Sequence, residues 1–169
     1  IVVDSSCDLQ ALTIGAGQID YSRVALKLDI GETEFTDDAS LDIAAFMDEM
    51  EAYKGRSGSA APGPHAWLEA FEKSENVFVI TITGALSGSF ASAQVAAKLF
   101  LDKYPERHIY LLDSRSTGPE MSLLVNRLAE LIQEGLPFDA IRSRIVEYSS
   151  RTYLLFALRS LDNLIKNGR

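Results

Sequence analysis

The sequence predicts an α/β fold in which a doubly wound, mostly parallel sheet is flanked by helices. Strand, polar loop and helix recur three times along its 169 residues, which is the pattern of such sheets. The clearest strand, Val77 to Ile82, is apolar and rich in β-branched residues, as are strands buried on both faces. A second strand covers Ile109 to Leu112, and Ile1 to Val3 form the end of a third.

The first half of the chain also predicts a hairpin and two helices. Apolar residues alternate with period two from Tyr21 to Phe35, with one break, which indicates two paired strands. Helical spacing from Leu41 to Met50 predicts a helix that Gly55 ends. Arg56 to Pro64 form a loop by composition, and the proline at its end begins the next helix.

Further helices are expected after the later strands. One contains Ala93 to Phe100, another contains Leu123 to Ile132, and a third runs roughly from Phe138 to Tyr148. Thr152 to Leu158 predict a last strand, and Leu161 to Ile165 a short helix.

Length and composition predict one compact, cytoplasmic domain. A chain of 169 residues that is 47% hydrophobic can bury a core without disulfides or metals. The sequence has no apolar stretch long enough to span a bilayer and no pattern of a signal peptide. Cys7 has no cysteine partner, and with His65 and His108 it does not form a metal cluster, so we expect no metal and no cofactor.

The net charge of −8 argues against nucleic acid as a partner. Neutralising phosphates needs clustered Lys and Arg, which the sequence lacks. An acidic surface favours solubility or a basic protein partner.

Three hydroxyl-rich loops follow predicted strands, at the positions where open α/β sheets bind ligands. They are Asp4 to Asp8, Thr83 to Ser89 and Asp113 to Gly118. The end of the second loop, Ser87-Gly88-Ser89, opens a helix, so backbone N–H groups, the helix dipole and two hydroxyls can converge on an anion. The alternative is that one of these serines only caps the helix.

Ser57 and Ser59 form a fourth hydroxyl cluster, on a loop that Pro62 and Pro64 keep extended. An ordinary turn is the alternative interpretation of this segment.

Several enzyme and nucleotide-binding motifs do not occur in the sequence. Gly-x-Ser-x-Gly, Gly-x-x-x-x-Gly-Lys and Gly-x-Gly-x-x-Gly are all missing. His108 begins a strand, which is the wrong end for a base that activates a serine in a loop after a strand. These observations favour a protein that holds an acidic ligand without transforming it. An enzyme that uses a serine or Cys7 as nucleophile on an acyl or phosphoryl substrate remains the alternative.

Four segments share residue type, order and spacing with one known family. They are Val3-Asp4-Ser5-Ser6-Cys7-Asp8-Leu9, the loop from Ser57 to Pro62, Leu86-Ser87-Gly88-Ser89-Phe90-Ala91-Ser92-Ala93, and Leu112-Asp113-Ser114-Arg115-Ser116. Through them the chain resembles the DegV family of fatty-acid-binding proteins over essentially its whole length, and Asn167-Gly168-Arg169 is similar to the family's Gly-Gly-Arg motif. Because family members are longer, the resemblance implies that residues 1–169 are an N-terminal α/β lipid-binding domain without the smaller C-terminal domain.

The resemblance also implies a ligand site. In the family, hydroxyls from a Thr-Ser-Gln-Pro-Ser-Pro loop and a Ser-Gly-Thr loop bind the carboxylate of a long-chain fatty acid. Ser57 falls at the first Thr of one motif and Ser89 at the Thr of the other, with Ser87 beside it. Secondary candidates are Ser5, Ser6, Ser59, Gly88, Ser114 and Arg169.

The chain departs from the family in two places. The first loop, Ser57 to Pro62, keeps a hydroxyl first and Pro last but loses the middle Ser, Gln, Pro and Ser. Gly118-Pro119-Glu120-Met121 replaces a Gly-rich helix start and places the Glu120 carboxylate near the expected site.

For function, the resemblance implies a carrier that presents the carboxyl group of a long-chain fatty acid to a partner such as a fatty acid kinase. Besides the nucleophilic enzyme, a regulatory or oligomerisation module with an empty pocket is an alternative.

Overall fold

The computed structural model describes residues 1–15, 17–155, 157 and 165, and its main sheet is parallel, as the sequence predicts. The strand order is β2 (Ser22–Val24), β1 (Val2–Asp4), β6 (Asn76–Thr81), β7 (His108–Asp113). Each neighbouring pair runs in the same direction. The carboxyl ends of these strands therefore meet at one edge of the sheet.

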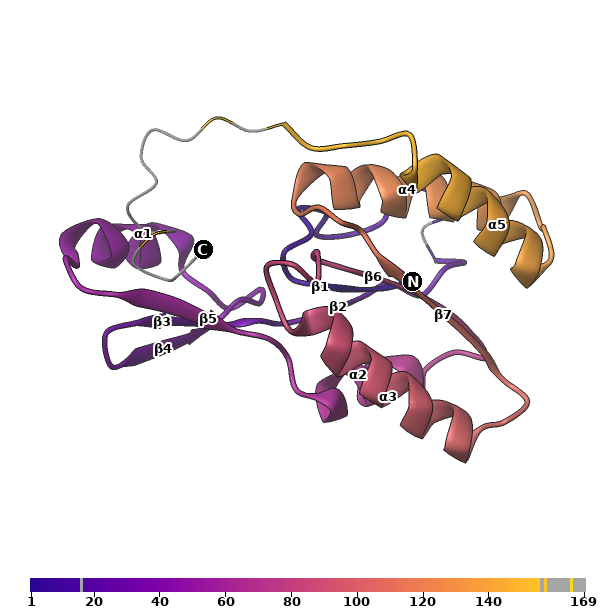
Figure 1. Cartoon of the computed structure of the whole chain (residues 1–169), viewed down its shortest axis with the longest axis horizontal. Helices are drawn as coiled ribbons and strands as arrows, with labels where there is room; N and C mark the ends of the chain where they lie inside the picture. The colour runs from indigo at the N-terminus through magenta and orange to yellow at the C-terminus, as the bar shows by residue number, and fades with distance from the viewer. Residues whose placement is uncertain (16, 156, 158–164, 166–169) are drawn as a thin grey trace.

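Helices cover both faces of this sheet (Figure 1). α2 (Pro64–Phe71) and α3 (Ser89–Lys103) pack on one face, and α4 (Pro119–Gln133) and α5 (Phe138–Ser149) pack on the other. None of the helices in the described part of the chain is long and apolar enough to cross a membrane.

β6 explains why both faces are covered. Val77 and Val79 belong to the core on the α2 and α3 side, whereas Phe78 and Ile80 belong to the core on the α4 and α5 side. Successive side chains of a strand point to opposite faces, so a strand that is apolar at every position has to be buried twice.

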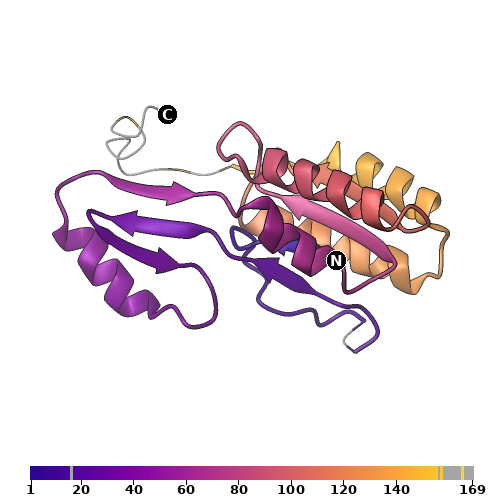
Figure 2. The same cartoon turned by 90° about the horizontal axis from the view of Figure 1, so that it is seen from below.

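A second, antiparallel sheet lies beside the main one (Figure 2). Its order is β4 (Thr33–Thr36), β3 (Lys27–Ile30), β5 (Ser57–Ala60). The pairing of Ile30 with Thr33 confirms the predicted hairpin.

β5 corrects the prediction of a loop from Arg56 to Pro64. Its first residue, Ser57, lies opposite Ile30 in β3, and its last, Ala60, lies opposite Lys27. Strands pair through backbone N–H and C=O groups, which Ser, Gly and Ala supply as well as larger residues do. This strand therefore has no apolar alternation from which the sequence could have predicted it.

α1 (Ile43–Ala52) is the helix predicted from Leu41 to Met50. The Asp42 carboxylate caps it by accepting the N–H of Ala45 at 3.0 Å. None of its residues is buried.

The main sheet contains the strand, loop and helix unit twice, at β6–α3 and β7–α4, and not three times as predicted. The described residues between β1 and β2 form no helix. Residues 152–155 and 157 are in no strand, against the strand predicted from Thr152 to Leu158, because no described segment pairs with them. The helix predicted from Leu161 to Ile165 lies outside the described residues, apart from residue 165.

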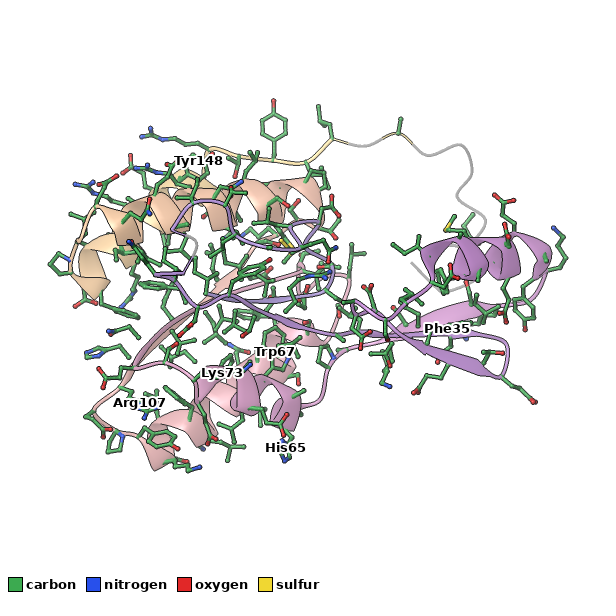
Figure 3. The ribbon with its side chains drawn as sticks, turned by 180° about the vertical axis from the view of Figure 1, so that it is seen from behind. Phe35, His65, Trp67, Lys73, Arg107 and Tyr148 are labelled. Atoms are coloured by element: carbon green, nitrogen blue, oxygen red, sulfur yellow. The ribbon has the colours of Figure 1, made fainter. Side chains whose placement is uncertain are left out.

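Aromatic rings form the core between the sheet and α2. Phe71 is 0% exposed, and its ring centroid lies 5.9 Å from that of Trp67 and 6.1 Å from that of Phe100. In Figure 3, Trp67 points into the molecule and His65 points outward from the same helix.

Removing the ring of Phe71 tests this core. Phe71→Ala leaves a cavity among packed rings, so we expect the free energy of unfolding of the full-length protein to fall by about 3 to 5 kcal/mol in urea titrations. Ile43 in α1 is 68% exposed, and Ile43→Ala is the matched control, with an expected change within about 0.5 kcal/mol. Equal losses in the two variants would contradict this description of the core.

Candidate functional site

The loops after β1 and β6 meet around one buried carboxylate. Asp4, at the end of β1, is 0% exposed. Its Oδ2 accepts hydrogen bonds from the backbone N–H of Ile82 (2.9 Å) and the hydroxyl of Ser89 (2.6 Å). Its Oδ1 accepts hydrogen bonds from the backbone N–H and the hydroxyl of Ser6. A buried charge needs such donors, and here they join the β1 loop to the end of β6 and the first turn of α3.

The contact with Asp4 limits what Ser89 can do. A hydroxyl carries one proton, and Ser89 donates it to Asp4. Ser89 is 0% exposed, and its backbone N–H donates to Ser87 Oγ at 3.2 Å. Ser89 therefore lies behind the loop and supports it.

A second carboxylate joins the loops after β6 and β7. Asp113 accepts hydrogen bonds from the backbone N–H of Gly84 (3.2 Å to Oδ2) and of Arg115 (2.9 Å to Oδ1). Next to it, the backbone N–H of Thr83 donates to the carbonyl of Ser116 at 2.9 Å. These bonds hold the two loops against each other.

Three of the secondary candidates form hydrogen bonds inside the loops. Ser5 Oγ accepts the backbone N–H of Leu26 at 3.0 Å. Ser114 Oγ accepts the backbone N–H of Ser116 at 3.0 Å and donates to its carbonyl at 2.9 Å. Ser6 makes the bonds to the β1 carboxylate already described. The structure gives all three side chains a role in loop shape.

Cys7, in the loop after β1, is 0% exposed. Its Sγ lies 3.8 Å from the hydroxyl oxygens of Tyr21 and Ser122. Burial raises the pKa of Tyr21, and Cys7 adds to this rise, so the phenol remains a donor to the carbonyl of Leu9 at 2.7 Å. The thiol is thus part of the core, which does not favour Cys7 as a nucleophile.

Ser59 and Ser87 line one pocket of about 420 Å³ between the end of β5 and the loop before α3. The rest of its wall is backbone or apolar, namely Ala61, Gly84, Ala85, Leu86, Gly88, Phe90 and Ala91. Small-molecule sites typically measure about 300 to 1,000 Å³. Hydroxyls beside an apolar wall suit a ligand that has a polar head and an apolar tail.

The structure places Ser59 in this pocket and Ser57 outside its lining. Ser57 pairs with Ile30, at the hairpin end of β5. The sequence held a signal for this difference, because the family motif Thr-Ser-Gln-Pro-Ser-Pro has two prolines. Matching both of them, to Pro62 and Pro64, puts Ser59 at the position of the first Thr.

Other predicted positions lie apart from this pocket. Arg169 is outside the described residues. Glu120, in the first turn of α4, is 4% exposed and does not line the pocket. His65 is exposed on α2 and pairs with Glu69 at 3.4 Å, and His108 begins β7.

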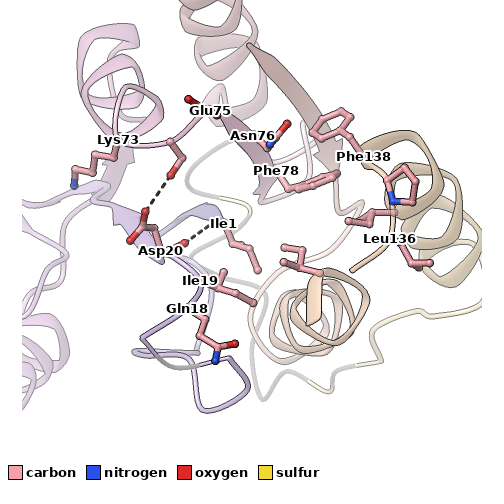
Figure 4. Close-up of a pocket in the computed structure, with 14 residues that line it drawn as sticks. Ile1, Gln18, Ile19, Asp20, Lys73, Glu75, Asn76, Phe78, Leu136 and Phe138 are labelled. Carbon is pink, nitrogen blue, oxygen red and sulfur yellow. Dashed lines mark hydrogen bonds between the residues drawn. The ribbon is translucent and has the colours of Figure 1, made fainter. Parts of the chain in front are cut away.

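Another pocket, of about 590 Å³, lies at the amino ends of β1 and β6 (Figure 4). Phe78 and Phe138 form part of its apolar wall, and Ser74 donates to the carboxylate of Asp20 at 3.2 Å on its polar side. Parallel sheets bind ligands at the opposite edge, beyond the carboxyl ends of the strands. The pocket of Ser59 and Ser87 is therefore the candidate site.

Asp4→Asn tests whether the buried carboxylate holds the loops. The amide of Asn puts an NH₂ group where a carboxylate oxygen now accepts two hydrogen bonds, so the N–H groups of Asn would face the N–H and O–H donors that now bind Asp4. We expect the free energy of unfolding of the full-length protein to fall by about 1.5 to 3 kcal/mol, measured by urea titration. Asp8 is exposed, and Asp8→Asn is the control. If both variants are as stable as the parent, Asp4 does not hold the loops together.

Known proteins include close relatives of this chain. A DegV domain-containing protein of Streptococcus gordonii is 47% identical over 169 residues, which are 100% of this chain and 60% of that protein. A related protein of Streptococcus pneumoniae serotype 4 is 44% identical over the same share of each chain. The chain thus spans about 60% of the length of these relatives.

Solved structures share the fold closely. The Streptococcus pneumoniae fatty acid kinase (Fak) B3 protein loaded with linoleic acid matches with a TM-score of 0.95 and 43% identity, over 99% of this chain and 60% of that one. A DegV family protein from Eubacterium eligens loaded with heptadecanoic acid matches with a TM-score of 0.92 and 40% identity, over 99% and 59%. The family model described as "Uncharacterised protein, DegV family" matches residues 1–169. The chain belongs to the DegV family.

Proposed function

We propose that the protein holds a long-chain fatty acid, whose carboxylate accepts hydrogen bonds from the hydroxyls of Ser59 and Ser87. The observation that carries the proposal is the pocket itself, because it joins these two hydroxyls to an apolar wall. Two relatives that are 43% and 40% identical to this chain over the aligned residues are solved with fatty acids bound.

The hydroxyl of Ser87 can donate a hydrogen bond to a ligand. Its Oγ accepts the backbone N–H of Ser89, and among the described residues it donates to none, so its proton is available to a ligand. The positive end of α3 lies directly behind it, since Gly88 is the N-cap of that helix. A hydrogen bond to a carboxylate is roughly twice as strong as one between neutral groups.

The apolar wall suits the acyl chain. Leu86 and Phe90 supply its large side chains, and Leu86 is still 38% exposed. We propose that the part of the full-length protein outside this chain completes the cover over the tail, because the chain spans about 60% of its relatives' length.

We also propose that the ligand is presented, unchanged, to a fatty acid kinase in the cytoplasm. Support for the partner comes from the Streptococcus pneumoniae relative, which is named for such a kinase. Support for binding without catalysis comes from the histidines, since neither His65 nor His108 lines the pocket that Ser87 faces. The unpaired thiol of Cys7 is compatible with a reducing compartment.

Mass spectrometry of lipid released from the full-length protein tests the proposed ligand. After purification and denaturation, we expect a long-chain fatty acid at close to one molecule per protein. Protein that releases no lipid, and that takes up none when it is incubated with fatty acids, would favour the module with an empty pocket.

Single hydroxyl deletions test the proposed donors. Ser87→Ala and Ser59→Ala each remove one hydrogen bond to the carboxylate, so we expect fatty-acid affinity to fall by about five- to thirty-fold, or about 1 to 2 kcal/mol. Affinity is measured by titrating delipidated full-length protein with a fluorescent fatty acid.

Ser57→Ala is the matched control, because Ser57 lies on the same strand as Ser59 and outside the pocket lining. The fatty-acid affinity of Ser57→Ala should equal that of the parent protein. A loss for Ser57→Ala together with unchanged affinity for Ser59→Ala would refute the assignment.

A further inference from the structure

We propose that Arg115 is the cation that attracts the negatively charged head of the ligand to the pocket of Ser59 and Ser87. This inference rests on the proposed function and extends it, because it assigns recognition of charge to a residue separate from the two hydroxyl donors.

The position of Arg115 follows from the carboxylate of Asp113. That side chain accepts the backbone N–H of Arg115 at 2.9 Å and also the backbone N–H of Gly84. Gly84 is part of the pocket wall. Arg115 is not itself a lining residue, but two hydrogen bonds through Asp113 connect its backbone to the wall, and we call this position beside the pocket its rim.

The guanidinium of Arg115 is available. Its side chain is exposed and has no hydrogen bond or ion pair with any residue that the structure describes. Arg23, at the same edge of the sheet, differs in this respect. Its guanidinium donates to the carbonyls of Ser5 (3.0 Å) and Cys7 (3.4 Å), so it is committed to holding a loop.

Acidic residues around this edge make a cation useful for attracting an anionic ligand. The chain has a net charge of −8, and Asp4, Asp8, Asp113 and Glu120 all lie in or next to the loops that follow the strands. An anionic head that approaches the pocket meets this negative field. Arg115 provides the opposite charge there.

The backbone at Arg115 is unusual in a way that fits this role. Arg115 has a φ of 56°, and it is the one non-glycine residue with a positive φ in the described part of the chain. This conformation is unfavourable for residues with a side chain, and such positions cluster at functional sites. The bonds of Asp113 hold the residue in that conformation.

A charge at the rim acts mainly on the rate of association and on its dependence on salt. In the full-length, delipidated protein we expect Arg115→Gln to slow the binding of a pyrene-labelled long-chain acid about two- to five-fold at low salt. At about 1 M salt, where the Debye length is about 3 Å, the difference should vanish. Arg115→Lys should keep most of the parent rate, because it keeps the charge.

Neutral and doubly charged probes separate charge recognition from damage to the fold. A pyrene-labelled alcohol with the same acyl-chain length should bind to Arg115→Gln and to the parent protein at equal rates. For the corresponding alkyl phosphate, Arg115→Gln should slow association more than it does for the acid. Arg144→Gln is the control for loss of a positive charge elsewhere, since Arg144 lies on α5 with a side chain that is 52% exposed and pairs with Glu134 at 3.0 Å.

Two results would overturn the proposal: an acid rate unchanged by Arg115→Gln, or an equal loss for acid and alcohol. If the parent protein binds no acid at all, the proposed function itself is wrong, so the two failures are distinguishable.

Discussion

The buried carboxylate of Asp4 is the constraint on which the candidate site depends. A charge with no exposure to water has to be surrounded by donors, and here they come from Ser6, Ile82 and Ser89, which belong to different parts of the chain. The parallel sheet makes this possible, because it places the ends of β1 and β6 side by side. The hydrogen bond from Ser89 to Asp4 fixes the first turn of α3 against the end of β1, and Ser87, in the loop before this helix, lines the pocket.

The pocket arises where the two sheets meet. The main sheet supplies Ser87 through the loop after β6, and the small sheet supplies Ser59 through β5. In the proposed site, the neutral hydroxyls of Ser59 and Ser87 would bind the ligand carboxylate, so the site would need no buried cation. On our proposal, Arg115 would attract the ligand from a position that water still screens, and the serines would bind it.

Much of this fold can be predicted from the sequence because burial leaves a direct pattern. The apolar run of β6 and the spacing of the helices identify the layers, and the Ser-rich loops identify the edge of the sheet at which the candidate site lies. β5 could not be predicted, since a strand of Ser, Gly and Ala pairs through its backbone alone. The choice between Ser57 and Ser59 depended on which proline of the family motif was matched, and the structure places Ser59 in the pocket.

The role of Asp4 cannot be predicted from sequence patterns either. An aspartate after a strand predicts a solvated loop, and no neighbouring residue indicates that it contacts a serine 85 residues away.

A crystal structure of the full-length protein with a long-chain fatty acid tests the account most directly. It should show the ligand carboxylate between the hydroxyls of Ser59 and Ser87, with Ser89 still bound to Asp4. A carboxylate bound instead in the pocket at the amino ends of β1 and β6, or one that displaces Ser89 from Asp4, would contradict it.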